Sequence, residues 1–120
     1  MSHFSTVQVS YIDADALMAA LAALGYTPQW HQQPVQLRND WGTADLTHSA
    51  EIVVPMPGKA DVGFAYREGV WHLIADDYEL RHHAATFRHD LALQYATLQA
   101  QQLGYQVVQE GNALIACPIQ

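Results

Sequence analysis

The chain has 120 residues, a length that fits a single domain spanning residues 1–120. Twelve acidic and five basic side chains give a formal net charge of −7, which argues against binding of nucleic acid or anionic lipid. No apolar stretch is long enough to span a bilayer and the start lacks the pattern of a signal peptide, so we expect a cytoplasmic protein without membrane insertion.

A strand followed by a helix is predicted at the start of the chain. The run Phe4–Ile12 alternates partly between polar and apolar residues, which is typical of a strand. Asp13 is the expected N-cap of a helix over Ala14–Leu24. Gly25 ends this helix, because glycine readily takes the left-handed conformation that closes a helix. The apolar stripe of the helix consists of Leu17, Leu21 and Leu24.

The middle of the chain predicts an antiparallel meander. Two short strands are expected around residues 29–31 and 35–38, and a clearer strand at Glu51–Val54. Two further strands, Asp61–Tyr66 and Val70–Ala75, flank a glycine-containing turn that is typical of a hairpin. These last three strands should pair in sequence order.

The last third repeats the change from helix to strand. A second helix is expected to begin between residues 79 and 84, with Asp77 as an early cap. It ends at Leu103-Gly104-Tyr105, the same tripeptide as Leu24-Gly25-Tyr26 at the end of the first helix. Its apolar stripe consists of Phe87, Leu91, Tyr95 and Leu98.

The order of these elements predicts an α+β fold. Tyr105–Gln109 and Asn112–Ile119 should pair as a closing hairpin, in which the lone Cys117 is expected to be buried and unreactive. An antiparallel sheet with two helices packed on one face buries both apolar stripes economically. The paired helix-to-strand transitions favour a ferredoxin-like split arrangement with extra strands. The alternative is a larger curved sheet that grips its helices and leaves space for a ligand.

Four short motifs resemble a known family. They are Met1–Thr6, Asp61–Phe64, Asp77-Tyr78 and Gln94–Ala96, and they lie in the expected order along most of the chain. Together they resemble the hypothetical chloroplast reading frame thirty-five family of cyanobacteria, plastids and other bacteria, a domain of unknown function. The resemblance implies a small soluble protein outside the known enzyme families, with a link in photosynthetic members to photosystem assembly or maintenance. It carries over no catalytic residue.

The composition favours a non-enzymatic interaction or assembly module. Half of the residues are hydrophobic and only 14% are charged, so we expect a protein partner or a second copy to cover apolar surface. The sheet face turned away from the helices is the expected contact surface. Candidate interface residues are His3, Trp30, Trp41 and Trp71, and the tyrosines Tyr26, Tyr66 and Tyr105 could line a groove with the tryptophans.

Seven histidines, against five lysines and arginines, raise a second hypothesis of metal binding. On a regular strand His72 and Asp76 share a face, and Asp77 or His82 would complete a nitrogen and oxygen site for a divalent ion such as zinc. The protein would then be a metal-dependent enzyme or sensor. The competing interpretation is that the aspartates cap the helix and the histidines are solvated. A third hypothesis is a small apolar or aromatic ligand between sheet and helices, and no organic cofactor is expected.

Overall fold

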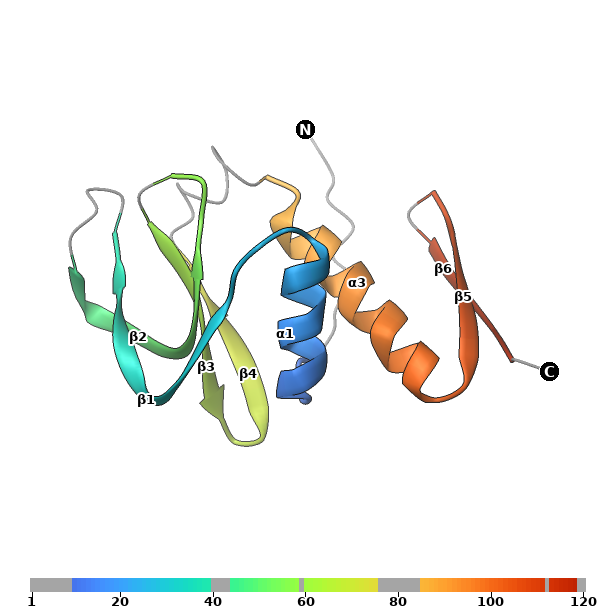
Figure 1. Ribbon diagram of the computed structural model, residues 1–120, viewed down its shortest axis with the longest axis horizontal. Coiled ribbons are helices and arrows are strands. Elements are labelled where there is room, and N and C mark those ends of the chain that lie inside the picture. Colours follow the sequence, from blue (N-terminus) through green and yellow to red (C-terminus); the bar gives the residue numbers. More distant parts are fainter. Residues whose placement is uncertain (1–9, 40–43, 59, 76–84, 112, 119–120) are drawn as a thin grey trace.

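The computed structural model describes residues 10–39, 44–58, 60–75, 85–111 and 113–118. Within them, two helices lie between a four-stranded antiparallel sheet and a separate two-stranded hairpin (Figure 1). The predicted α+β class is confirmed. In chain order the elements are α1 (Ala14–Ala23), β1 (Gln29–Arg38), β2 (Ala44–Pro55), β3 (Asp61–Arg67), β4 (Val70–Ile74), α3 (Phe87–Gln102), β5 (Tyr105–Glu110) and β6 (Ala113–Pro118).

Asp13 begins α1, as the sequence predicts. Its carboxylate accepts hydrogen bonds from the backbone amides of Asp15 at 3.0 Å and Ala16 at 3.2 Å, which satisfies donors that a helix start leaves without partners. At the other end Gly25 has a φ of 92°, and the amide of Tyr26 donates back into the last turn at 3.1 Å. This pattern is the Schellman motif, and only glycine takes its backbone conformation without strain.

The second helix, α3, also ends at a glycine in the left-handed conformation. Gly104 has a φ of 88° and its amide donates into the last turn at 3.0 Å. At the start, Thr86 occupies the cap position and its hydroxyl donates to the Asp90 carboxylate at 2.8 Å. The helix therefore begins at residue 87, while the start predicted at 79–84 and its cap Asp77 fall outside the described residues.

Both helices pack on one face of the four-stranded sheet, as predicted. The leucines of α1 and the alternating large side chains of α3 enter the same core. Leu24 and Leu98 lie at its rim and are partly buried. The largest buried members are Leu17, Leu21, Ile52, Val54, Met56, Val62, Phe64, Trp71, Phe87, Leu91 and Tyr95.

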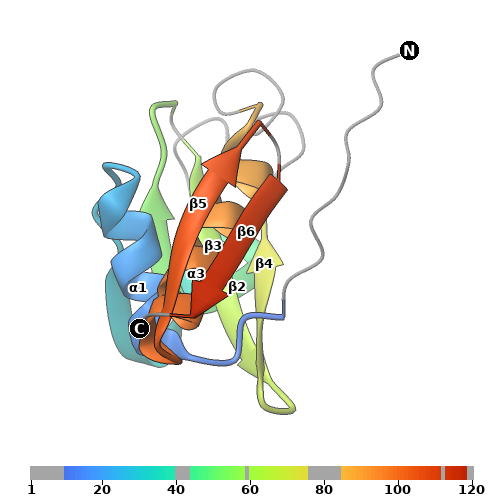
Figure 2. The ribbon, with the colours of Figure 1, turned by 90° about the vertical axis from the view of Figure 1, so that its right-hand side faces the viewer.

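The strand order corrects one detail of the prediction. The four-stranded sheet follows the sequence order β1-β2-β3-β4, and among the described strands β5 and β6 pair with each other alone. A ferredoxin-like split arrangement would bring a strand after the second helix into the main sheet. Instead the chain turns back along the other side of α3 after Gly104, so the hairpin forms an outer layer over that helix (Figure 2). The first predicted strand, Phe4–Ile12, lies mostly outside the described residues.

The segment that leads into α1 is pinned at two points. Tyr11 forms an antiparallel bridge with Trp71 of β4, and the Trp71 amide donates to the Tyr11 carbonyl at 2.7 Å. The buried hydroxyl of Tyr95 in α3 accepts hydrogen bonds from the amides of Ile12 and Asp13, both at 3.0 Å. This short segment therefore joins the edge of the sheet to the second helix.

One strand, β1, replaces the two short strands expected in this region. Its pairing with β2 shifts register between Trp30 and Val35 and again between Gln36 and Arg38. Pro34 lies in the first shift, where the lack of an amide hydrogen prevents a regular ladder. Such irregularities increase the twist of a strand pair.

A second, smaller core covers the sheet face opposite the helices. Leu37 of β1 lies over β3 at Gly63, where an added Cβ would be 2.9 Å from Leu37 methyl groups and 2.6 Å from the Cβ of Ala50. The expected contact surface on this face is thus partly occupied by the chain itself. The buried members of this core are Leu37, Ala50, Val53 and Ala65.

Cys117 is exposed on β6, so the expectation of burial is wrong. The apolar run that predicted burial forms a strand of the hairpin. Val108 and Ile115, which form a cross-strand pair in this hairpin, are exposed as well, so apolar composition alone did not place the strand in a core.

We expect Gly63→Ala to lower the free energy of unfolding by about 1–3 kcal/mol, as overpacking of a filled core does. The added methyl would overlap the Cβ of Ala50, which has no torsion that could move it away. Chemical denaturation of both proteins measures the difference. In an Ala50→Gly background the same substitution should have a smaller effect, and an equal loss in both backgrounds would contradict the proposed overlap.

Candidate interaction surface

Three aromatic side chains form a cluster that we call the aromatic patch: Trp30, Tyr66 and Trp71. The Trp30 and Trp71 rings meet edge to face with centroids 5.7 Å apart, and the Tyr66 and Trp71 rings are tilted with centroids 5.0 Å apart. Trp71 is 6% exposed, whereas Trp30 and Tyr66 are 50% and 52% exposed. A buried indole thus supports two large rings that remain open to solvent.

The sheet places these rings on the side that also carries the helices. Tyr66 and Trp71 stand opposite each other in the β3–β4 register, and opposite residues of an antiparallel pair point to the same face. Phe64 lies two residues before Tyr66 and belongs to the helix-facing core, which fixes that face. Trp30 reaches the group from β1, where it pairs with Ile52 of the same core.

The base of the aromatic patch is continuous with the main core. Trp71 is bonded through its amide to Tyr11, whose ring contacts Phe64 at 5.9 Å and Tyr95 at 4.9 Å, both nearly perpendicular. Each such edge-to-face pair contributes about 0.5–1.5 kcal/mol beyond burial of its area. The exposed rings are therefore supported by a chain of ring contacts that ends in α3.

A carboxylate lies beside the aromatic patch. The β2–β3 ladder ends at the Ile52–Phe64 pair, so it supplies no strand partner to the Tyr66 amide. The Glu51 carboxylate accepts a hydrogen bond from that amide at 2.7 Å. This contact satisfies a backbone donor and sets a negative charge at the backbone of Tyr66.

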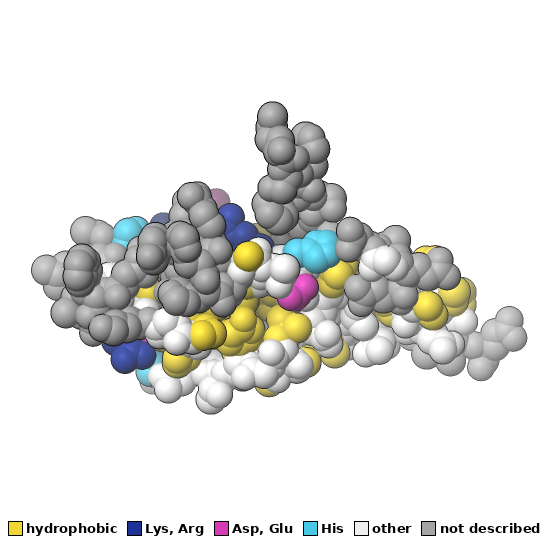
Figure 3. All heavy atoms as spheres, turned by 90° about the horizontal axis from the view of Figure 1, so that it is seen from above, with side chains coloured by type: hydrophobic (Ala, Val, Ile, Leu, Met, Phe, Trp, Pro, Cys, Tyr) yellow, Lys and Arg dark blue, Asp and Glu magenta, His cyan; other side chains and the backbone are white. Residues whose placement is uncertain are grey.

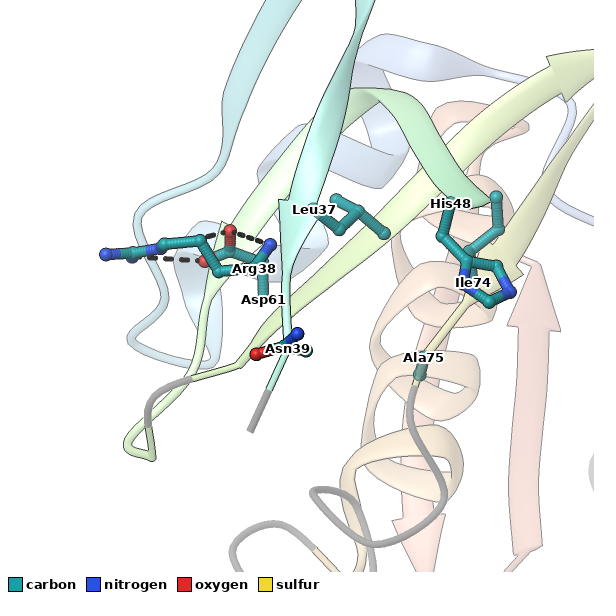
Figure 4. A pocket seen from close by; sticks show the side chains of 7 residues that line it. All are labelled: Leu37, Arg38, Asn39, His48, Asp61, Ile74 and Ala75. Carbon is teal, nitrogen blue, oxygen red and sulfur yellow. Dashed lines mark hydrogen bonds and ion pairs between the residues drawn. The ribbon is translucent and has the colours of Figure 1, made fainter. Parts of the chain in front are cut away.

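A small hollow lies at the far end of the opposite sheet face (Figure 4). The buried Asp61 carboxylate accepts hydrogen bonds from the Arg38 amide at 3.0 Å, from Nε at 3.3 Å and from Nη2 at 3.2 Å. Hydrogen bonding to Asp61, and then its charge, raise the pKa of Arg38. The hollow is lined by Leu37, Arg38, Asn39, His48, Asp61, Ile74 and Ala75.

The volume and charge of this hollow fit a structural role. It measures about 150 Å³, whereas pockets for small molecules measure roughly 300–1,000 Å³. The guanidinium of Arg38 and the carboxylate of Asp61 neutralise each other in direct contact at one side of it. Asp61 therefore ties the end of β1 to the start of β3, and the hollow gives no support to the hypothesis of a small-molecule ligand.

The structure brings together two of the four predicted interface residues. Trp30 and Trp71 are in contact, while His3 and Trp41 fall outside the described residues. Tyr66, a further aromatic candidate, joins them because the hairpin turn sets it opposite Trp71. The sequence alone carries no signal for Glu51, because its contact with the Tyr66 amide depends on where the β2–β3 ladder ends.

Of the predicted metal ligands, the structure places only His72. It stands opposite Ala65 on β3 and is exposed on the sheet face away from the helices. Asp76, Asp77 and His82 lie outside the described residues, so this site stays a prediction. Among the residues that are described, no three histidine, cysteine or acidic side chains are grouped to hold a metal ion.

We expect the protein to lose stability as the pH rises from 10 toward 12. Burial, and then the proximity of Tyr95, raise the pKa of Tyr11 to about 12 from its usual 10. The folded state thus favours the neutral phenol, so this contribution is complete below pH 10 and is lost as the pH approaches 12. Thermal unfolding across this range measures the effect. Tyr11→Phe should show a shallower decline, and identical slopes would contradict the assignment.

Comparison with known proteins gives one family. The model of a family described as "Protein of unknown function (DUF1257)" matches residues 20–114. A relative named "Uncharacterized protein ycf35", from Cyanophora paradoxa, is 32% identical over 98 residues, which cover 80% of this chain and 73% of the relative. No solved structure matches the chain.

These matches confirm the resemblance drawn from the sequence motifs, since the matched relative carries the name that abbreviates the thirty-fifth hypothetical chloroplast reading frame. In the part of the chain that is described, neither helix is long and apolar enough to cross a membrane. The chain belongs to the DUF1257 family of proteins of unknown function, and resembles Ycf35 over most of its length.

Proposed function

We propose that this protein is a non-enzymatic interaction module that binds a protein partner through the aromatic patch. The supporting observation is that Trp30 and Tyr66 are half exposed while they rest on buried Trp71. Tryptophan and tyrosine dominate the residues that carry binding energy at protein interfaces, and they act best from a fixed position. The ring contacts below Trp71 supply that fixed position.

The partner is expected to present basic side chains next to apolar ones. The Glu51 carboxylate lies beside the Tyr66 backbone, and the chain as a whole carries a formal charge of −7. A lysine or arginine over an indole or phenol face gains a cation–π contact, and opposite charge speeds encounter. An acidic partner would be repelled by the Glu51 carboxylate and by the net negative charge of the chain.

We expect Trp30→Ala to weaken partner binding at least tenfold, because truncation of a central aromatic anchor removes 1.4 kcal/mol or more. The partner would be identified by native mass spectrometry of the protein purified gently from its host. Calorimetry with the purified partner then gives the affinity of each variant.

Glu51→Gln keeps an acceptor for the Tyr66 amide but removes the charge, so it should reduce both the affinity for the partner and the dependence of that affinity on salt.

The matched control is Leu103→Ala, since Leu103 is a large exposed apolar residue on another element. It should bind within twofold of the wild type. Circular dichroism and the unfolding midpoint show whether Trp30→Ala remains folded. Equal affinity of a folded Trp30→Ala variant, or a chain that leaves its host without any partner, would contradict the proposal.

A further inference from the structure

The outer edge of β4 has the form of an edge to which a strand is added. β4 is the last strand of the four-stranded sheet, and it pairs with β3 without a register shift (Figure 2). The other edge strand, β1, carries two register shifts and Pro34, and such features block the addition of a further strand. The sequence of β4 contains no lysine, acidic residue or proline. β4 therefore lacks the usual protection of an exposed edge.

One backbone position on this edge is without a strand partner among the described residues. The Trp71 amide donates to the Tyr11 carbonyl at 2.7 Å, so the backbone groups of Trp71 point away from β3. Backbone groups point to the same side at every second residue of a strand, so those of Leu73 also point away from β3. Leu73 is partly buried, and no described strand pairs with it on that side. A partly buried amide and carbonyl require hydrogen-bond partners.

The bridge between Tyr11 and Trp71 fixes the register of any continuation along this edge. The bridge is antiparallel, so a step of two residues toward the N-terminus on one strand matches a step of two residues toward the C-terminus on the other. Val9 then stands opposite Leu73. In this register the amide and carbonyl of Val9 meet the carbonyl and amide of Leu73, because the bonded pairs of an antiparallel ladder recur at every second residue.

The residue pattern of the segment before Tyr11 agrees with this register. The ring of Tyr11 packs on the main core, and side chains two residues apart share a face, so Val9 and Val7 take the same face as Tyr11. On that face Leu73 and Ala75 are partly buried at the rim of the core. Figure 3 looks onto the end of the molecule at which β4 ends, and shows hydrophobic side chains gathered over its middle. The residues that alternate with the valines are all polar: Thr6, Gln8 and Ser10.

We propose that residues 6–10 add a further strand to the sheet, antiparallel to β4, with Val9 bonded to the backbone of Leu73. Residues 1–9 lie outside the described part of the chain, which reaches this edge at Tyr11. Because Val9 is two residues from Tyr11, it meets Leu73 at an effective concentration that a strand of another molecule does not reach. Chain connectivity thus selects this segment as the occupant. The added strand does not depend on the proposed function, since neither Trp30 nor Tyr66 takes part in it.

Proline substitutions at two adjacent positions test this proposal on the full chain. In the proposed register the Val9 amide donates to Leu73, whereas the Gln8 amide points away from β4. Val9→Pro should therefore speed exchange of the Leu73 amide with solvent about tenfold or more, measured by nuclear magnetic resonance. Gln8→Pro is the matched control, because an edge strand tolerates proline where the missing amide would face solvent. It should leave the Leu73 rate within about twofold of the wild type.

Contacts between alpha protons provide a second readout, which reports the register itself. Between the bonded pairs of an antiparallel ladder, opposite Cα atoms approach to about 4.5 Å. The wild type should therefore show nuclear Overhauser contacts between the alpha protons of Ser10 and His72, and between those of Gln8 and Ile74. A Leu91 amide that stays protected in α3 shows that Val9→Pro remains folded.

Equal exchange of the Leu73 amide in the wild type and in a folded Val9→Pro variant would overturn the proposal. Equal acceleration by Gln8→Pro and Val9→Pro, or alpha-proton contacts in another register, would overturn it as well. Protection of Leu73 that increases with protein concentration would assign this edge to a second copy of the chain instead. Protection that is independent of concentration and lost only in Val9→Pro is the expected result.

Discussion

The hydroxyl of Tyr95 joins the parts of this fold that are far apart in sequence. It is buried in α3 and accepts the amides of Ile12 and Asp13 at the entry to α1. Asp13 then caps α1, and the adjacent Tyr11 bridges to Trp71 on the edge of the sheet. One side chain thus holds both helices and β4 in a fixed relation, because an unpaired amide in this partly buried place would cost about 1–3 kcal/mol.

The two faces of the four-stranded sheet are closed by different means. The helices cover one face with a large core, and the β1–β2 ribbon covers part of the other through the contact of Leu37 with Gly63. The ion pair between Arg38 and Asp61 secures the end of that ribbon. The faces of the sheet are therefore largely used for folding, and the exposed apolar groups described above lie beside the helices and on the outer layer.

Local signals in the sequence predicted the local structure well. The Asp13 cap, the repeated Leu-Gly-Tyr ends and the stripes of the two helices follow from hydrogen bonding and periodicity within a few residues. Strand order was not predictable in the same way, because alternation tells which side chains share a face but not which strand is the neighbour. For this reason the sequence predicts the closing hairpin as part of a split sheet and Cys117 in a core, whereas β5 and β6 form a separate sheet and Cys117 is exposed.

The aromatic patch shows the same limit at a candidate site. The sequence marks Trp30, Tyr66 and Trp71 as aromatic, but the meeting of Trp30 with Trp71 depends on how β1 lies across the twisted sheet, with a register shift directly after Trp30. Likewise, the Glu51 carboxylate can accept the Tyr66 amide because the β2–β3 ladder reaches only as far as Ile52, the residue after Glu51. Such positions result from tertiary packing and have no signature in spacing or composition.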